Sequence, residues 1–305
     1  MRKFLLISAC FAMTACATTK PAVQVEVRPV TQSASQNQTS KFDAKSALSA
    51  ANTLQNNADY FASYDAYKAV LLRIDKKHES RSQAMLGLAD SALALSWHDG
   101  NYADQARKFY TKIAQIDASK DGLKRRAENG LLLLDLADFT PKAAKKHLHT
   151  ALKHSQNDAR LWNALGKVHD GEQDWLDALD AYIKALTAAK SGGQSTAAVV
   201  NNMGMSLLMQ GRKKEALAKF KQAKKASPEM PVYDNNLRLA QTLSGKTDKA
   251  LKGLSDTRTA QIYNDAGVIA QAQGNKTKAA HLYKKAIKTS PVYFELAEEN
   301  LAGLG

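Results

Sequence analysis

Four asparagines recur along the second half of the chain in a pattern that could recognise a peptide. They are Asn163, Asn201, Asn235 and Asn264, separated by 38, 34 and 29 residues. An asparagine side chain carries both a hydrogen-bond donor and an acceptor, so a row of them can pair with the backbone of an extended peptide. Met205 would add an adaptable apolar surface beside the row. The pattern predicts a peptide-binding groove; the alternative is that the asparagines join one structural repeat to the next.

The seven histidines give no arrangement that indicates a metal site or a catalytic site. A zinc site needs three or four converging ligands, whereas His147 and His154 offer two at most, and His149 would point to a different face of the helix from His147. His169 is expected to be packed or hydrogen-bonded between helices. No pair of carboxylates is distinguished by its spacing, and no segment is left over for a catalytic domain. We therefore predict no catalytic residue, no metal and no cofactor, and we expect that the protein is not an enzyme.

The positions of these residues depend on a repeat of small and large side chains. The repeat runs through Trp162, Leu165, Gly166, Ala178, Tyr182 and Ala185; Met203, Gly204, Ala216, Phe220, Ala223 and Pro228; Leu237, Ala250 and Leu254; and Ala266, Gly267, Ala279, Tyr283, Ala286 and Pro291. Gly or Ala is needed where two helices cross closely, and large residues fill the grooves between neighbouring pairs. The pattern resembles the tetratricopeptide family, which implies a stack of helical hairpins of about 34 residues each.

The fold class that we predict is all-α, a right-handed α-solenoid of about six to seven hairpins. Residues 159–305 contain the well-matched repeats and a C-terminal capping helix, and residues 42–158 contain degenerate repeats. The spacing of 38, 34 and 29 residues predicts one unit with a short insertion, one ideal unit and one trimmed unit. In the first half we expect helices at 43–56, 59–74, 80–97, 102–116, 124–136 and 141–154, with Gly87 and Tyr110 in the same pair.

The N-terminus resembles a secretory signal that ends in a lipid-attachment site. A basic start, residues 1–3, precedes an apolar run, residues 4–13, that is too short to cross a bilayer core of ~30 Å. Met13-Thr14-Ala15-Cys16 resembles the lipobox of bacterial lipoproteins. Ile7-Ser8-Ala9-Cys10 fits the box letters better, but it would leave an apolar region of about five residues where ~7 are normally needed. We predict a signal peptide over 1–15 and lipidation at Cys16, with Cys10 as the alternative.

Residues 16–41 are predicted to form the lipidated cysteine and a disordered tether. The segment is rich in Thr, Ser and Gln and has no helical period, and its typical reach is about 25 to 30 Å. The resemblance to lipoproteins implies that Ala17, which follows the lipid site, directs the protein to the outer membrane, where it would face the periplasm. Three acyl chains would anchor it far more firmly than a single chain, whose membrane binding is marginal.

The chain has a formal net charge of +14, which raises the question of an acidic partner. The lysines crowd the second helices of the predicted hairpins, and this wall of the solenoid is expected to be a solvated face. An envelope location removes nucleic acid as the natural partner. Anionic lipid headgroups or an acidic protein surface are the functional alternatives for this basic wall.

Three segments extend the resemblance beyond the repeat. Together with the lipoprotein signal and the tether, residues 198–207, 211–212 and 232–240 resemble the TadD family of tight-adherence (Flp) pilus assembly lipoproteins. That resemblance implies a non-enzymatic outer-membrane component that supports a type IVb pilus secretin, with protein partners from a pilus or secretion assembly. An adaptor for another envelope complex, in outer-membrane protein insertion or peptidoglycan synthesis, is the alternative. The sequence leaves the oligomeric state open.

Overall fold

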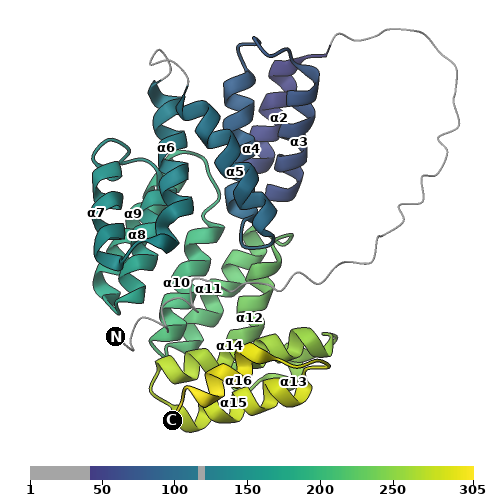
Figure 1. The fold of residues 1–305 in the computed structure, drawn as a ribbon, viewed down its shortest axis with the longest axis vertical. Helices are drawn as coiled ribbons and strands as arrows, with labels where there is room; N and C mark the ends of the chain where they lie inside the picture. The colour runs from purple at the N-terminus through teal and green to yellow at the C-terminus, as the bar shows by residue number, and fades with distance from the viewer. Residues whose placement is uncertain (1–41, 116–120) are drawn as a thin grey trace, which may run out of the picture. The chain divides into compact units, whose positions relative to one another are not determined.

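The computed structural model describes residues 42–115 and 121–305, and these residues form helices with no strand (Figure 1). The predictions of a signal peptide, of lipidation at Cys16 and of a tether lie outside the described residues. The helices are α2 (Ala44–Asn56), α3 (Tyr60–Arg73), α4 (Arg81–Leu95), α5 (Gly100–Ala114), α6 (Asp121–Asp135), α7 (Pro141–Leu152), α8 (Ala159–Gly171), α9 (Trp175–Ser191), α10 (Ala197–Met209), α11 (Lys213–Ala226), α12 (Pro231–Leu243), α13 (Thr247–Leu251), α14 (Asp256–Ala272), α15 (Lys276–Thr289) and α16 (Glu295–Ala302). A short 3₁₀ turn, η2 (Leu136–Asp138), follows α6. The prediction of an all-helical fold is confirmed.

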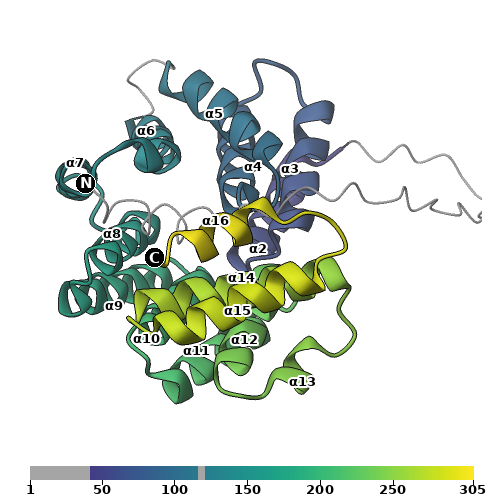
Figure 2. The same cartoon turned by 60° about the horizontal axis from the view of Figure 1, so that its bottom comes forward.

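The helices follow one another as seven successive pairs, from α2 and α3 to α14 and α15. The pairs α4–α5, α8–α9, α10–α11 and α14–α15 pack closely, and α11 against α12 and α12 against α14 join consecutive pairs. The trimmed unit appears as α13, which has five residues. Figure 2 shows α16 beside α15, where it covers the end of the last pair. The predicted succession of helical hairpins is thus observed, and a capping role for α16 stays a prediction.

The described residues separate into two compact units. The N-terminal unit contains residues 42–53 and 60–130, and the C-terminal unit contains residues 131–305 together with Leu54–Asp59. In the N-terminal unit, Leu48, Tyr67 and Leu88 belong to a buried cluster that joins α2, α3 and α4. In the C-terminal unit the largest cluster extends from α10 to α15 and includes Phe220 and Tyr283. A solenoid has no single central core, so each hairpin is stabilised mainly by its neighbours.

Glycines of the C-terminal unit lie where an aromatic ring of the paired helix crosses them. A Cβ atom added to Gly166 would lie 2.6 Å from the Tyr182 ring, and one added to Gly267 would lie 2.5 Å from the Tyr283 ring. Gly204 has the same relation to Phe220. In each pair the ring comes from the second helix of the same hairpin, as the repeat predicts, because the two backbones approach too closely for any side chain larger than hydrogen.

Gly87 and Tyr110 lie in one helix pair, α4 and α5, as the sequence predicts, but the N-terminal unit covers its glycines with rings from different helices. The ring that covers Gly87 is that of Tyr67, from the preceding hairpin, and the ring of Tyr110 covers Gly130 in α6. The reason is that α3 packs directly against α4, so the gap left by the glycine of α4 is filled from the helix before it. The aromatic residue therefore precedes its glycine in this half of the chain and follows it in the other.

Candidate protein-binding surface

The four predicted asparagines lie on the first helices of four successive hairpins. Asn163 is on α8, Asn201 on α10, Asn235 on α12 and Asn264 on α14. Asn201 and Asn264 are buried, with 6% and 2% of their surface exposed, whereas Asn163 and Asn235 are partly exposed. The register predicted from the sequence therefore places the four residues on equivalent helices but gives them two different environments.

A line of amide hydrogen bonds joins α8, α10 and α12. The Asn202 Nδ2 donates to Asn163 Oδ1 at 3.0 Å, and the Asn201 Nδ2 donates to Asn202 Oδ1 at 3.3 Å. The next step runs from Asn236 Nδ2 to Asn201 Oδ1 at 2.9 Å. Because each bond satisfies a buried or partly buried polar group, the line favours one relative position of the three hairpins.

The remaining two asparagines also bond to a following helix. Asn264 Oδ1 accepts a hydrogen bond from Asn300 Nδ2 of α16 at 2.9 Å, and Asn235 Oδ1 accepts one from the Arg258 guanidinium of α14. These contacts correspond to the joining role that the sequence left open as the alternative. Binding of a ligand by the row stays a prediction, and the exposed surface available for it belongs to Asn163 and Asn235.

Sequence reasoning did not assign a role to the residues that complete these bonds. Asn202 and Asn236 each directly follow a predicted asparagine. The two Asn-Asn pairs in the sequence could therefore have indicated their part in these hydrogen bonds. Asn300 carried no such signal, because it lies on the capping helix outside the repeat. Met205, the apolar residue predicted beside the row, is partly buried and packs against the cluster that contains Phe220. Its role in binding also stays a prediction.

Buried carboxylates of the described helices act as links between hairpin elements. Asp170 of α8 accepts hydrogen bonds from Ser206 Oγ of α10 at 2.6 Å and from the Tyr182 hydroxyl of α9 at 2.7 Å. Burial raises the pKa of Asp170, although both hydrogen bonds act in the opposite direction. In the N-terminal unit, Asp90 accepts from the Tyr110 hydroxyl at 2.6 Å and from Arg126 Nε at 2.8 Å. These acids have partners on two other helices each, which suits a packing role.

One further acid lies within the asparagine row. Asp265 of α14 follows Asn264 directly and accepts a hydrogen bond from its Nδ2 at 3.4 Å. Burial raises the pKa of Asp265 to about 6, and the bond from Asn264 only partly offsets this effect. A partner with a cationic group close to this helix would lower that pKa and keep the carboxylate charged.

A basic hollow of about 710 Å³ opens in the C-terminal unit between α7, α8 and α9. Its lining residues are His149, Leu152, Lys153, Gln156, Asn157, Trp162, Lys184, Thr187, Ala188 and Ser191. The Trp162 indole donates to the Gln156 carbonyl at 2.8 Å, and the Lys184 ammonium lies 4.9 Å from the centre of the indole ring. The lining contains cationic side chains and no acidic one, so the hollow is suited to an anionic group.

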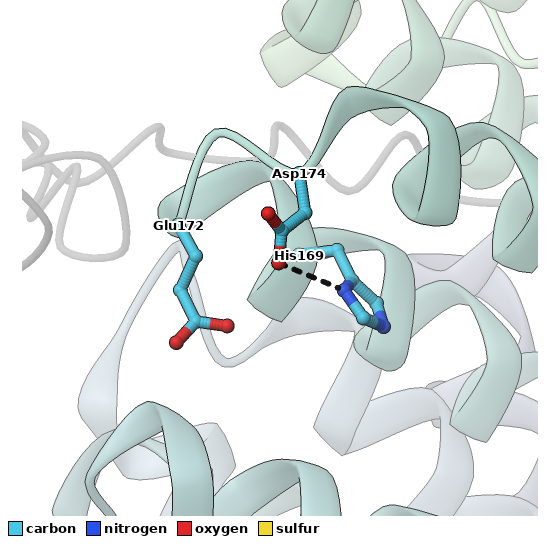
Figure 3. A group of neighbouring side chains, drawn as sticks. All are labelled: His169, Glu172 and Asp174. Carbon is cyan, nitrogen blue, oxygen red and sulfur yellow. Dashed lines mark ion pairs between the residues drawn. The ribbon is translucent and has the colours of Figure 1, made fainter.

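The turn between α8 and α9 gathers three side chains of metal-binding type. His169, Glu172 and Asp174 each offer one ligand atom, and these atoms lie within 4.8 Å of one another. Figure 3 shows the imidazole of His169 and the carboxylate of Asp174 facing each other, with Glu172 to the left of them in this view. No metal site was predicted from the sequence, because that prediction rested on the spacing of the histidines alone. This group instead combines one histidine with two acids that a turn places beside it.

Two segments of the chain match tetratricopeptide repeat profiles, one over residues 157–229 and the other over residues 259–290. They contain the hairpins α8–α9 and α10–α11, and the helices α14 and α15. No curated protein matches the sequence. Among the described residues, no helix combines the length and the apolar character that a membrane crossing needs.

Solved structures match the chain at low sequence identity. A tetratricopeptide repeat protein from Parabacteroides merdae is 15% identical, with a TM-score of 0.41, and the match covers 86% of this chain and 98% of that one. A Rap protein complexed with competence and sporulation factor is 15% identical, with a TM-score of 0.49 and coverages of 85% and 75%. YrrB, described as a tetratricopeptide repeat protein with an unusual peptide-binding site, is 18% identical, with a TM-score of 0.31 and coverages of 77% and 97%.

The repeat matches and the successive helix pairs define the class of protein. The described residues form a helical repeat protein, and residues 157–229 and 259–290 are similar to tetratricopeptide repeats. Repeats of this kind generally mediate protein–protein interactions, because stacked helices present an extended surface to a partner. We therefore consider the surfaces described above as binding surfaces for protein partners.

Proposed function

We propose that this protein is a lipid-anchored adaptor of the outer membrane that binds a protein component of a tight-adherence, type IVb pilus secretin during assembly. One observation carries the proposal. Two of the segments that resemble the pilus assembly lipoproteins, residues 198–207 and 232–240, coincide with α10 and α12. These are the helices that carry Asn201 and Asn235, so the resemblance falls on the elements that the asparagine row occupies.

The surface that would meet the partner is the face of the first helices α8, α10 and α12. The line of amide hydrogen bonds fixes these helices relative to one another, so the exposed edges of Asn163 and Asn235 are held in place before a partner arrives. A preorganised surface loses less conformational entropy on binding than a flexible one. An extended segment of a pilus or secretion subunit could pair with these amides through its backbone.

Anchoring gives the adaptor its place in the envelope. Lipid on Cys16 would hold the chain at the outer membrane, and the segment over 16–41 would give the repeats their reach toward the partner. The basic hollow beside Trp162 offers a second contact, for an anionic group of the partner. In this proposal the lipid anchors the protein to the membrane and the repeats bind the partner. Neither part is assigned a catalytic role.

The partner can be identified by capture from the native envelope. The full-length protein would be purified after mild crosslinking, and the proteins that accompany it would be identified by mass spectrometry. Enrichment of a secretin and other tight-adherence pilus components would support the proposal. Recovery of outer-membrane protein insertion or peptidoglycan synthesis machinery in their place would reject the pilus assignment while leaving the adaptor role.

Substitutions in the asparagine row should separate binding from packing. We expect Asn163→Ala together with Asn235→Ala to weaken binding of the captured partner by about tenfold, since both residues have exposed amide surface. By contrast, Asn201→Ala should lower the free energy of unfolding by about 1 to 3 kcal/mol, because it leaves the buried Asn236 Nδ2 without its acceptor.

Affinity would be measured by biolayer interferometry and unfolding by circular dichroism in urea. Asn201→Ala is the matched control for the exposed pair, because it removes the same group from the same row at a buried position. Unchanged affinity in the exposed double variant would show that the row only joins hairpins.

A further inference from the structure

At the turn between α8 and α9 lies a buried nitrogen atom that has no hydrogen-bond partner among the described residues. His169 lies near the end of α8 and is 8% exposed, and its Nδ1 is buried and makes no hydrogen bond. The nearest charged atoms are Asp174 Oδ2 at 3.6 Å and Asp177 Oδ2 at 3.9 Å. Both separations exceed the range of an N–H···O hydrogen bond. A buried polar nitrogen that makes no hydrogen bond destabilises the fold.

The separations fit two ligand atoms that share a metal ion. Zinc binds histidine nitrogen and carboxylate oxygen at about 2.0 to 2.2 Å, so two ligand atoms on a tetrahedral zinc lie about 3.4 Å apart. The His169 Nδ1 and Asp174 Oδ2 are 3.6 Å apart and face each other across the turn (Figure 3). The ligand atom of Glu172 lies within 4.8 Å of both.

From this geometry we propose that His169, Glu172 and Asp174 form a binding site for a zinc ion. Three protein ligands leave the fourth tetrahedral position open to water, as in zinc sites that combine histidine with a carboxylate. A neutral imidazole nitrogen favours zinc over magnesium or calcium, which prefer oxygen ligands. The short loop Glu172–Asp174 brings both acids to the histidine, and Gln173 between them adopts a positive φ of 63°, which reverses the chain there.

A lysine competes for the same place. The Lys145 ammonium of α7 pairs with the Glu172 carboxylate and lies 3.9 Å from Asp174 Oδ2. The turn thus holds a positive charge between these acids, but the ammonium makes no hydrogen bond with His169 Nδ1, which stays without a partner. A zinc ion would satisfy the imidazole as well as the two carboxylates. Binding therefore displaces Lys145, and the lysine weakens the affinity of the site for zinc.

Because Lys145 competes with zinc for the two carboxylates, a variant without this lysine should bind zinc more tightly. Zinc affinity of the full-length protein, free of any histidine tag, would be measured by isothermal titration calorimetry. We expect one zinc ion per chain, a loss of at least about tenfold in affinity for His169→Gln and for Asp174→Asn, and a gain for Lys145→Met. His281→Gln, at an exposed histidine of α15, is the control and should bind as the wild type does.

A spectroscopic measurement makes the test independent of whether a buried-histidine variant folds. Cobalt(II) bound to the wild type in a tetrahedral site with a nitrogen ligand should give intense visible absorption that added zinc abolishes. Affinity that stays unchanged in Asp174→Asn and Lys145→Met would overturn the proposal, as would the absence of stoichiometric zinc binding by the wild type. Circular dichroism of each variant identifies any loss of affinity that comes from unfolding.

Discussion

Replacing Gly267 by Ala should destabilise the C-terminal unit by about 2 kcal/mol, although Ala is the better helix former. The added Cβ would lie 2.5 Å from the Tyr283 ring, which is fully buried and whose hydroxyl donates to Gln271 at 2.7 Å. The ring has no space to move into, so α14 and α15 would have to separate. Separation would disturb the cluster that extends from α10 to α15. The measurement is urea unfolding followed by circular dichroism.

Two further variants isolate the cause. Gly122→Ala, at an exposed helical glycine with no atom within 4 Å of an added Cβ, should be neutral or slightly stabilising. In a Tyr283→Ala background the penalty of Gly267→Ala should disappear, because the ring that causes the clash has been removed. A penalty of equal size in both backgrounds would mean that the close helix crossing does not explain the glycine.

Replacing Cys16 by Ala should release the protein from the membrane into the soluble periplasmic fraction. The reason is that triacylation, which would hold the chain stably, requires the cysteine thiol. The matched control is Cys10→Ala, which should remain membrane-bound because Cys10 would be removed with the signal peptide. Membrane fractionation and metabolic labelling with palmitate would report the two properties separately.

The opposite pattern would decide between the two cysteines. If Cys10→Ala were released and Cys16→Ala kept both its lipid label and its membrane association, the attachment site would be Cys10. Membrane association of both variants without any label would reject the lipid anchor altogether. Only the second result would require a different explanation of how the protein is held at the membrane.

The parts of the fold that the sequence predicted are those that depend on residue size at a helix crossing. Gly166 with Tyr182 and Gly267 with Tyr283 identified their hairpins because only a glycine allows such close approach of a ring. At Gly87 the sequence placed Tyr110 in the correct helix pair, but it did not indicate that the ring over this glycine, that of Tyr67, comes from the helix before it. Size alone does not say which of two neighbouring helices supplies the ring, since both lie at a similar distance.

The site was less accessible to sequence reasoning for a related reason. The equivalent positions of Asn201 and Asn264 were read correctly, but their burial depends on how each hairpin is turned against the next. The partners of these two residues, Asn236 and Asn300, lie more than thirty positions away in the chain. The group at His169 was missed because a histidine followed three and five residues later by acids looks like an ordinary helix end until the turn brings the three together.

Secretin assembly in the native bacterium is the most direct test of the proposed function. Cells that lack this protein would be complemented with the wild type or with Cys16→Ala, and secretin multimers in the outer membrane would be quantified by immunoblotting without denaturation. We predict that the multimers are lost without the protein, are restored by the wild type, and are not restored by the released variant. Normal multimer levels in cells that lack the protein would contradict the proposal.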